Sequence, residues 1–105
     1  MPGEKILIVD DEKPINDLIR SYVESEGFTA LSVFNGHDAI ECVQKENPDL
    51  IILDVMLPDI EGINVCLELR KNNHVPIIFL SCKSEEIDKI VEEIREIYPD
   101  ASLIL

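Results

Sequence analysis

Short apolar runs alternate with segments of helical periodicity along the chain, and this alternation restricts the fold more than any other feature. Five runs are predicted to be β-strands, because each is rich in aliphatic side chains and is bounded by polar or turn-forming residues. They cover residues 5–9, 29–33, 50–53, 75–80 and 101–105. The first, third and fourth are almost continuously apolar, which is typical of strands covered on both faces. We therefore expect these three strands at the centre of a sheet.

Four segments between these strands have the spacing of amphipathic helices. Pro14 and Gly27 bound the first, Asn47 ends the second before a proline, Gly62 begins the third and Ser84 caps the fourth. Their predicted apolar stripes are Ile15, Leu18, Ile19, Tyr22 and Val23; Ala39, Ile40 and Val43; Ile63, Cys66 and Leu67; and Ile87, Ile90, Val91, Ile94 and Ile97.

Strands and helices that alternate with short connections predict an α/β domain with a parallel sheet, right-handed crossovers and helices on both faces. A chain of 105 residues is long enough for one such domain, so residues 1–105 are expected to fold as a unit. In parallel α/β sheets, ligands collect beyond the carboxyl ends of the strands. That edge is where a functional site is expected.

Acidic and hydroxyl side chains follow three of the predicted strands. Asp10 and Asp11 follow the first strand, Asp54 the third and Ser81 the fourth. Converging carboxylates repel one another, and Mg²⁺, which prefers oxygen ligands, is the simplest ion to neutralise them. We predict a Mg²⁺ site in which Asp54 is a nucleophile toward a phosphoryl donor and Ser81 donates to a phosphoryl oxygen. Taken singly, each of these residues equally fits a helix cap or a turn.

Three segments resemble the receiver domain of two-component response regulators: residues 6–12 (ILIVDDE), residues 48–58 (PDLIILDVMLP) with Gly62, and residues 75–81 (VPIIFLS). The resemblance covers about residues 4–90. It implies a flavodoxin-like, three-layer fold with strand order 2-1-3-4-5. It also implies that a sensor histidine kinase phosphorylates Asp54, that Asp10, Asp11 and Asp54 hold Mg²⁺ with the backbone carbonyl of Met56, and that Ser81 is the switch hydroxyl.

Residues 91–105 depart from the family pattern, which has a Lys-Pro pair after the fifth strand and then a fifth helix. Neither is present in this sequence, and Lys83 does not replace the lysine. A missing helix would leave half of one sheet face bare, so we expect homo-oligomers formed through that apolar face. The tail is interpreted as grafted onto a receiver or redesigned, which would make the chain a truncated or chimeric receiver. A naturally divergent receiver is the alternative.

Charge and hydropathy exclude several classes of protein. The formal net charge of −13 opposes direct nucleic-acid binding, and apolar runs of six residues are too short to cross a bilayer. No secretory signal begins the sequence, so a cytoplasmic location is expected. The three cysteines, Cys42, Cys66 and Cys82, have neither disulfide-framework nor zinc-site spacing, and are predicted to be reduced thiols.

A phosphoacceptor signalling module is the leading interpretation, with no enzymatic activity beyond self-catalysed phosphoryl transfer and dephosphorylation at Asp54. The alternative is a receiver-derived scaffold without signalling output, which the missing lysine and helix favour. A flavodoxin-like nucleotide binder is disfavoured because the acids at 10–12 would repel a phosphate. An aspartyl phosphatase would need a second aspartate where Met56 stands.

Overall fold

The computed structural model describes residues 3–80, which form four strands and three helices. The strands are β1 (Lys5–Val9), β2 (Thr29–Val33), β3 (Leu50–Asp54) and β4 (Ile77–Leu80), and the helices are α1 (Lys13–Ser25), α2 (Gly36–Glu46) and α3 (Gly62–Arg70). All seven elements predicted up to residue 80 are confirmed. The predicted fourth helix, the fifth strand and the atypical tail lie outside the described residues.

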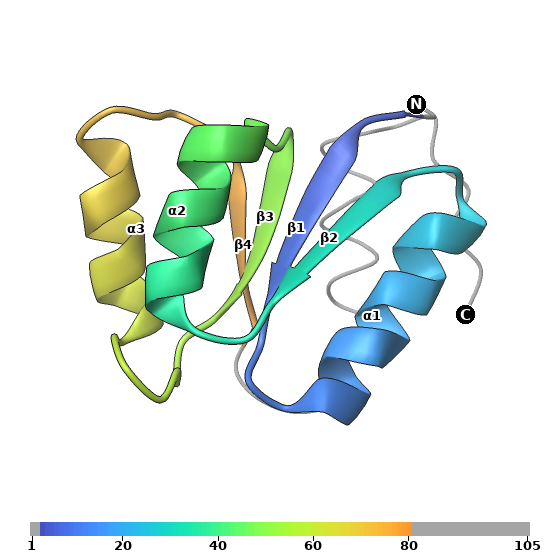
Figure 1. Ribbon diagram of the computed structural model, residues 1–105, viewed down its shortest axis with the longest axis horizontal. Helices are drawn as coiled ribbons and strands as arrows, with labels where there is room; N and C mark the ends of the chain where they lie inside the picture. The colour runs from blue at the N-terminus through green and yellow to red at the C-terminus, as the bar shows by residue number, and fades with distance from the viewer. Residues whose placement is uncertain (1–2, 81–105) are drawn as a thin grey trace.

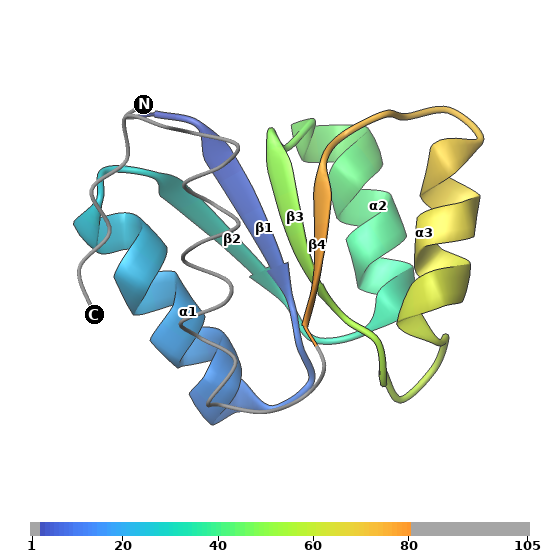
Figure 2. The same ribbon diagram turned by 180° about the vertical axis from the view of Figure 1, so that it is seen from behind.

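The four strands make one parallel sheet in the order β2-β1-β3-β4, which confirms the predicted order as far as the structure describes it. Val9 of β1 pairs with Val33 of β2 and with Leu53 of β3, so the carboxyl ends of these strands lie level with one another. Helix α1 covers one face of the sheet, and α2 and α3 lie together on the other (Figures 1 and 2).

Two apolar clusters fill the space on either side of the sheet, because successive side chains of a strand point to opposite faces. On the α1 side, the strands contribute Ile6, Ile8, Leu50, Ile52, Ile78 and Leu80. On the α2 and α3 side, the fully buried strand residues are Leu7, Val9, Ile51 and Leu53.

The uncovered apolar patch predicted on one face of the central strands is not found among the described residues. The apolar strand side chains on the α1 face are all buried, and the most exposed of those in the central strands and β4 is Ile78 at 4%. The expected self-association stays a prediction, because it was argued from residues 91–105, which lie outside the described residues.

Helix α3 does not present the stripe predicted from hydropathy. Ile63 and Leu67 are 57% and 62% exposed, whereas Gly62, Val65 and Leu69 are buried. The reason is steric, since Gly62 lies directly against the backbone of Asp54. This close approach sets the rotation of the helix, so that positions three and seven residues beyond Gly62 face the core.

The ends of the elements follow local chemistry. Gly27 has a φ of 88° after α1, and Asn47 ends α2 with a φ of 48°, a left-handed conformation that glycine and asparagine tolerate best. Strand β4 begins at Ile77 and not at residue 75, because Pro76 has no N–H to donate to a ladder. Phe79 of β4 is 41% exposed, so the predicted covering of both faces is wrong at this position.

Candidate functional site

Asp10 and Asp54 lie at the same edge of the sheet, at the carboxyl ends of adjacent parallel strands. Asp10 directly follows β1, and Asp54 is the last residue of β3. Their exposed fractions are only 1% and 2%, whereas the neighbouring Asp11 is exposed to solvent. One carboxylate oxygen from each of these three aspartates lies within 4.8 Å of the other two. The convergence predicted from the sequence is thus observed for all three acids.

Backbone N–H groups two residues further along the chain hold both buried carboxylates. Asp10 Oδ1 accepts a hydrogen bond from the Glu12 N–H at 2.8 Å, and Asp54 Oδ1 accepts one from the Met56 N–H at 3.0 Å. Each bond fixes the rotamer of its aspartate at the start of the loop that follows the strand. The site is therefore built from two short side-chain-to-backbone turns on neighbouring strands.

Asn16, the fourth residue of α1, connects the helix to the ends of two strands at this edge of the sheet. Its side chain is completely buried, and its Nδ2 donates to the carbonyl oxygens of Asp10 at 3.1 Å and Val33 at 3.0 Å. These two carbonyls belong to the ends of β1 and β2, so one amide group joins both strand ends to α1. Asn16 Oδ1 is buried and has no hydrogen-bond partner among the described residues.

The electrostatics of the site disfavour three negative charges. Burial raises the pKa of Asp10 to about 6; the Glu12 N–H acts in the opposite direction, and the charges of Asp54 and Asp11 add to the rise. Burial also raises the pKa of Asp54, and the negative charge of Asp11 adds to this rise although the Met56 N–H opposes it. A cation at this position would relieve both effects.

The donor set fits a hard divalent cation. All three groups offer oxygen, and two of them, Asp10 and Asp54, are held in buried positions where burial and neighbouring negative charge raise their pKa values. Oxygen donors of this kind suit Mg²⁺ and Ca²⁺ and do not suit thiophilic metals. The three aspartates of this cluster are among the residues that the sequence predicts to hold Mg²⁺.

The remaining predicted residues are placed as follows. Met56 is in the loop after β3, with its side chain 68% exposed and its N–H bonded to Asp54. Ser81 lies outside the described residues, but Leu80, which precedes it, pairs with Asp54 in the sheet. The carboxyl end of β4 therefore reaches the acidic edge.

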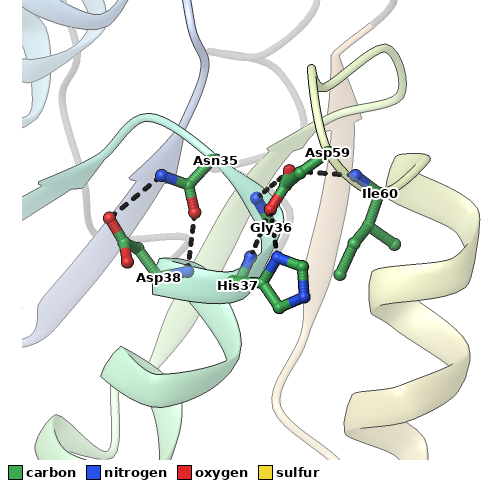
Figure 3. A network of polar contacts seen from close by, with 6 residues as sticks. All are labelled: Asn35, Gly36, His37, Asp38, Asp59 and Ile60. Carbon is green, nitrogen blue, oxygen red and sulfur yellow. Dashed lines mark hydrogen bonds and ion pairs between the residues drawn. The ribbon is translucent and has the colours of Figure 1, made fainter.

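A second polar network near the site was not predicted from the sequence. Asp59, in the loop between β3 and α3, accepts hydrogen bonds from the N–H groups of Gly36 at 2.8 Å and His37 at 3.0 Å, and its carboxylate also contacts His37 Nδ1 (Figure 3). Partial burial acts in the opposite direction, but these bonds and one from the Ile60 N–H together lower the pKa of Asp59 below its ordinary range. The adjacent Pro58 signals a turn, but no local pattern identifies a partner more than twenty residues away.

A parallel α/β sheet that carries three converging aspartates at its carboxyl edge defines a flavodoxin-like domain with an acidic site. The family model of the response regulator receiver domain matches residues 6–97, and the chain belongs to this family. Within residues 3–80, no helix has the length and apolar character needed to cross a membrane.

Several solved structures share this fold. The receiver domain of the Francisella response regulator 1452 is 30% identical, with a TM-score of 0.71 over 85% of this chain and 77% of its own. The BeF3-activated N-terminal receiver domain of Klebsiella pneumoniae RstA is 29% identical, with a TM-score of 0.70 over 86% of this chain and 80% of its own. A putative response regulator from Chloroflexus aurantiacus, 22% identical, has a TM-score of 0.76 over 90% and 97% of the two chains and shows the fold alone.

Proposed function

We propose that this receiver domain is a phosphoacceptor of two-component signalling, in which Asp54 accepts a phosphoryl group. Asp10, Asp11 and Asp54 would hold Mg²⁺ together with the backbone carbonyl of Met56. One observation carries the proposal: the buried carboxylate of Asp54 lies within 4.8 Å of the carboxylates of Asp10 and Asp11 at the edge where parallel sheets bind ligands.

The proposed reaction is the transfer of a phosphoryl group from a donor to the Asp54 carboxylate. An oxygen of the ionised Asp54 carboxylate attacks the phosphorus of the donor, and a new O–P bond forms. The P–N bond of a phosphohistidine, or the P–O bond of a small acyl phosphate, breaks; its electron pair leaves with the donor group, and a phosphohistidine donor then takes up a proton. Bound Mg²⁺ supplies positive charge that offsets the repulsion between the carboxylates and the incoming phosphate. The product is an acyl phosphate on Asp54.

The partner implied by this chemistry is a sensor histidine kinase in the cytoplasm, and no other enzymatic activity is proposed. Ser81 would donate a hydrogen bond to the phosphoryl group and act as the switch. The family's lysine is absent, so one positive charge that would face the phosphoryl group is missing. We therefore expect slow phosphoryl acceptance with weakened conformational output.

The second candidate is a receiver-derived scaffold that keeps the fold and the metal site without the chemistry. The same absence of the lysine favours it. Self-association is a separate prediction, and light scattering coupled to size-exclusion chromatography decides it.

Intact-mass spectrometry after incubation with acetyl phosphate and Mg²⁺ tests the proposal. We expect one phosphoryl adduct in the wild-type protein, and none in Asp54→Asn or after chelation of Mg²⁺. Asp49→Asn is the matched control, because Asp49 is also an aspartate bonded to a backbone N–H, that of Lys5 at 2.8 Å, but it lies at the opposite edge of the sheet. An adduct that persists in Asp54→Asn contradicts the assignment of the acceptor. Metal binding without any adduct supports the scaffold.

A further inference from the structure

The loop between β3 and α3, residues 55–61, forms one wall of a surface depression beside the acidic site. The depression is lined by Asp11, Val55, Met56, Leu57, Pro58 and Glu61. Five of these six residues belong to the loop and only Asp11 comes from elsewhere, so the position of the loop decides the shape of the approach to the site. What holds the loop in place is therefore relevant to the chemistry at Asp54.

The two ends of the loop are held by the site itself and by the start of α3. The Met56 N–H donates to Asp54 Oδ1 at 3.0 Å, and the Gly62 N–H donates to the Val55 carbonyl at 2.9 Å. These bonds fix the base of the loop. They do not connect its middle to the rest of the domain.

Leu57 and Ile60 of the loop pack against the core on the α2 and α3 side, and Asp59 supplies the polar connection. Its carboxylate extends from the middle of the loop to the first turn of α2, where it accepts hydrogen bonds from the N–H groups of Gly36 and His37 (Figure 3). The first-turn N–H groups of a helix have no partner within the helix, and the positive end of the helix dipole favours a carboxylate there. Gly36 allows the close approach, since a Cβ on it would lie 3.1 Å from Cβ of Ile60.

We propose that Asp59 is a positioning residue for phosphoryl transfer: by anchoring the β3–α3 loop to the first turn of α2, it holds Met56 and the wall of the site in the reactive arrangement. This inference rests on the proposed function of Asp54. Asp59 itself touches no reacting atom. Its removal takes away the polar anchor of the loop and leaves the apolar packing of Leu57 and Ile60, so that Met56 departs more often from its place beside Asp54.

A role confined to capping α2 is the competing explanation, and the helix offers a matched control for it. Asn35 caps the same helix independently, because its Oδ1 accepts from the Asp38 N–H at 2.8 Å (Figure 3). Asn35→Ala removes this cap and leaves the loop contacts of Asp59 in place. Asp59→Ala removes a cap and the loop anchor together.

The test compares both variants with the wild-type protein by amide hydrogen exchange and by Mg²⁺ titration, followed by NMR. In Asp59→Ala we expect the Met56 amide to exchange roughly two- to thirtyfold faster, the range that corresponds to the loss of one helix cap. We expect the Mg²⁺ dissociation constant to rise by roughly three- to tenfold, below the largest effects seen when ligand-orienting residues are removed. Asn35→Ala should change neither value by more than about twofold.

Asp59→Asn separates anchoring from charge and keeps the test decisive if the alanine variant folds poorly. An asparagine oxygen can still accept one of the two backbone N–H bonds, so we expect it to recover most of the protection at Met56. Equal effects of Asn and Ala indicate that charge alone is responsible and overturn the inference. Equal effects of Asp59→Ala and Asn35→Ala on Met56 also overturn it.

The phosphoryl-transfer rate with acetyl phosphate is measured last on the same proteins. A wild-type protein that binds Mg²⁺ but takes no phosphoryl group refutes the proposed function, while the exchange at Met56 still decides whether Asp59 anchors the loop. A wild-type protein that is phosphorylated at the same rate as Asp59→Ala refutes the positioning role alone. The expected result is a slower rate in Asp59→Ala at saturating Mg²⁺, with an unchanged rate in Asn35→Ala.

Discussion

Gly62 has no room for a side chain beside Asp54. A Cβ added to Gly62 would lie 2.2 Å from the carbonyl oxygen of Asp54 and 2.7 Å from Cα of Val55. Both atoms belong to the backbone that carries the proposed phosphoacceptor, so they cannot move aside without moving the site. The start of α3 can therefore pack this closely against the end of β3 only because residue 62 has no Cβ.

Gly62→Ala is expected to destabilise the fold and to disturb Asp54. Overpacking a close contact typically costs about 1–3 kcal/mol, and a clash with backbone lies at the upper end of this range. Gly36→Ala is the graded control, because its Cβ would meet side-chain atoms, Cγ2 of Val65 at 2.9 Å and Cβ of Ile60 at 3.1 Å, and no backbone atom at a shorter distance. Urea unfolding of both variants measures the difference. If Gly36→Ala loses more free energy of unfolding than Gly62→Ala, the contact between Gly62 and the Asp54 backbone is not the tighter of the two.

Asp10 makes the stability of the metal-free domain fall as the pH rises. Its pKa is raised to about 6 in the folded protein, whereas the ordinary value is 3.8, so within this interval only the folded state binds the proton. Stability is therefore highest below the interval and declines as the pH rises to about 6. Asp10→Asn removes this decline, and at pH 7 it should be more stable than the wild type by about 1–2 kcal/mol.

Chemical denaturation of both proteins between pH 4 and pH 7 checks this expectation. Asp17→Asn serves as the control, because Asp17 is exposed and pairs with Lys13 at 3.0 Å on the surface of α1. Its stability should follow the wild-type curve to within about 0.5 kcal/mol. A wild-type protein that gains stability from pH 4 to pH 6 relative to Asp10→Asn contradicts the assigned shift.

Mg²⁺ should stabilise the domain more at pH 7 than at pH 5. Protons compete with the metal for the acidic site, and the raised pKa of Asp10 places this competition near pH 6. Metal at about a hundred times its dissociation constant adds about 2.7 kcal/mol. Thermal unfolding measures the gain, with KCl at equal ionic strength as the control for general screening of the net charge of −13. Equal gains from both salts would exclude a specific site.

Substitutions at Asn16 should affect the edge of the sheet through its two buried hydrogen bonds. Asn16→Ala leaves the carbonyl of Asp10 without this donor, and we expect a loss of about 1–3 kcal/mol in the free energy of unfolding. Asn16→Asp is expected to cost more at pH 7 than at pH 5, because its carboxylate would be buried against carbonyl oxygens. Denaturation at the two pH values checks both. If Asn16→Ala and Asn16→Asp have the same stability at pH 7, the hydrogen bonds that Asn16 Nδ2 donates to the two carbonyl oxygens do not contribute as inferred.

The acidic site was predictable because the strand pattern alone brings its residues together. Asp10 and Asp54 each follow an apolar run, and adjacent parallel strands necessarily end at a common edge. The anchor at Asp59 was not predictable in the same way. It is one of 22 acidic residues, and its partners at Gly36 and His37 become neighbours only after α2 and the loop have packed.

The rotation of α3 shows a different limit. Hydropathy favours Ile63 and Leu67 as the inward positions, yet both are exposed. The deciding residue is Gly62, which lets α3 approach the backbone of Asp54 because it has no side chain. The periodicity of apolar residues cannot reveal such a contact. The same reasoning explains why the burial of the central strands was predicted well, since there the apolar pattern and the packing agree.

The unfavourable burial of Asp10 and Asp54 has a consequence for protein engineering. Asp10→Asn and Asp54→Asn relieve charge repulsion and keep the backbone hydrogen bonds, so each is expected to stabilise the domain by a single substitution. A selection for thermostability, protease resistance or expression would enrich them first. Libraries built on this scaffold should hold positions 10 and 54 constant, because the improved proteins would otherwise be those that have lost the site.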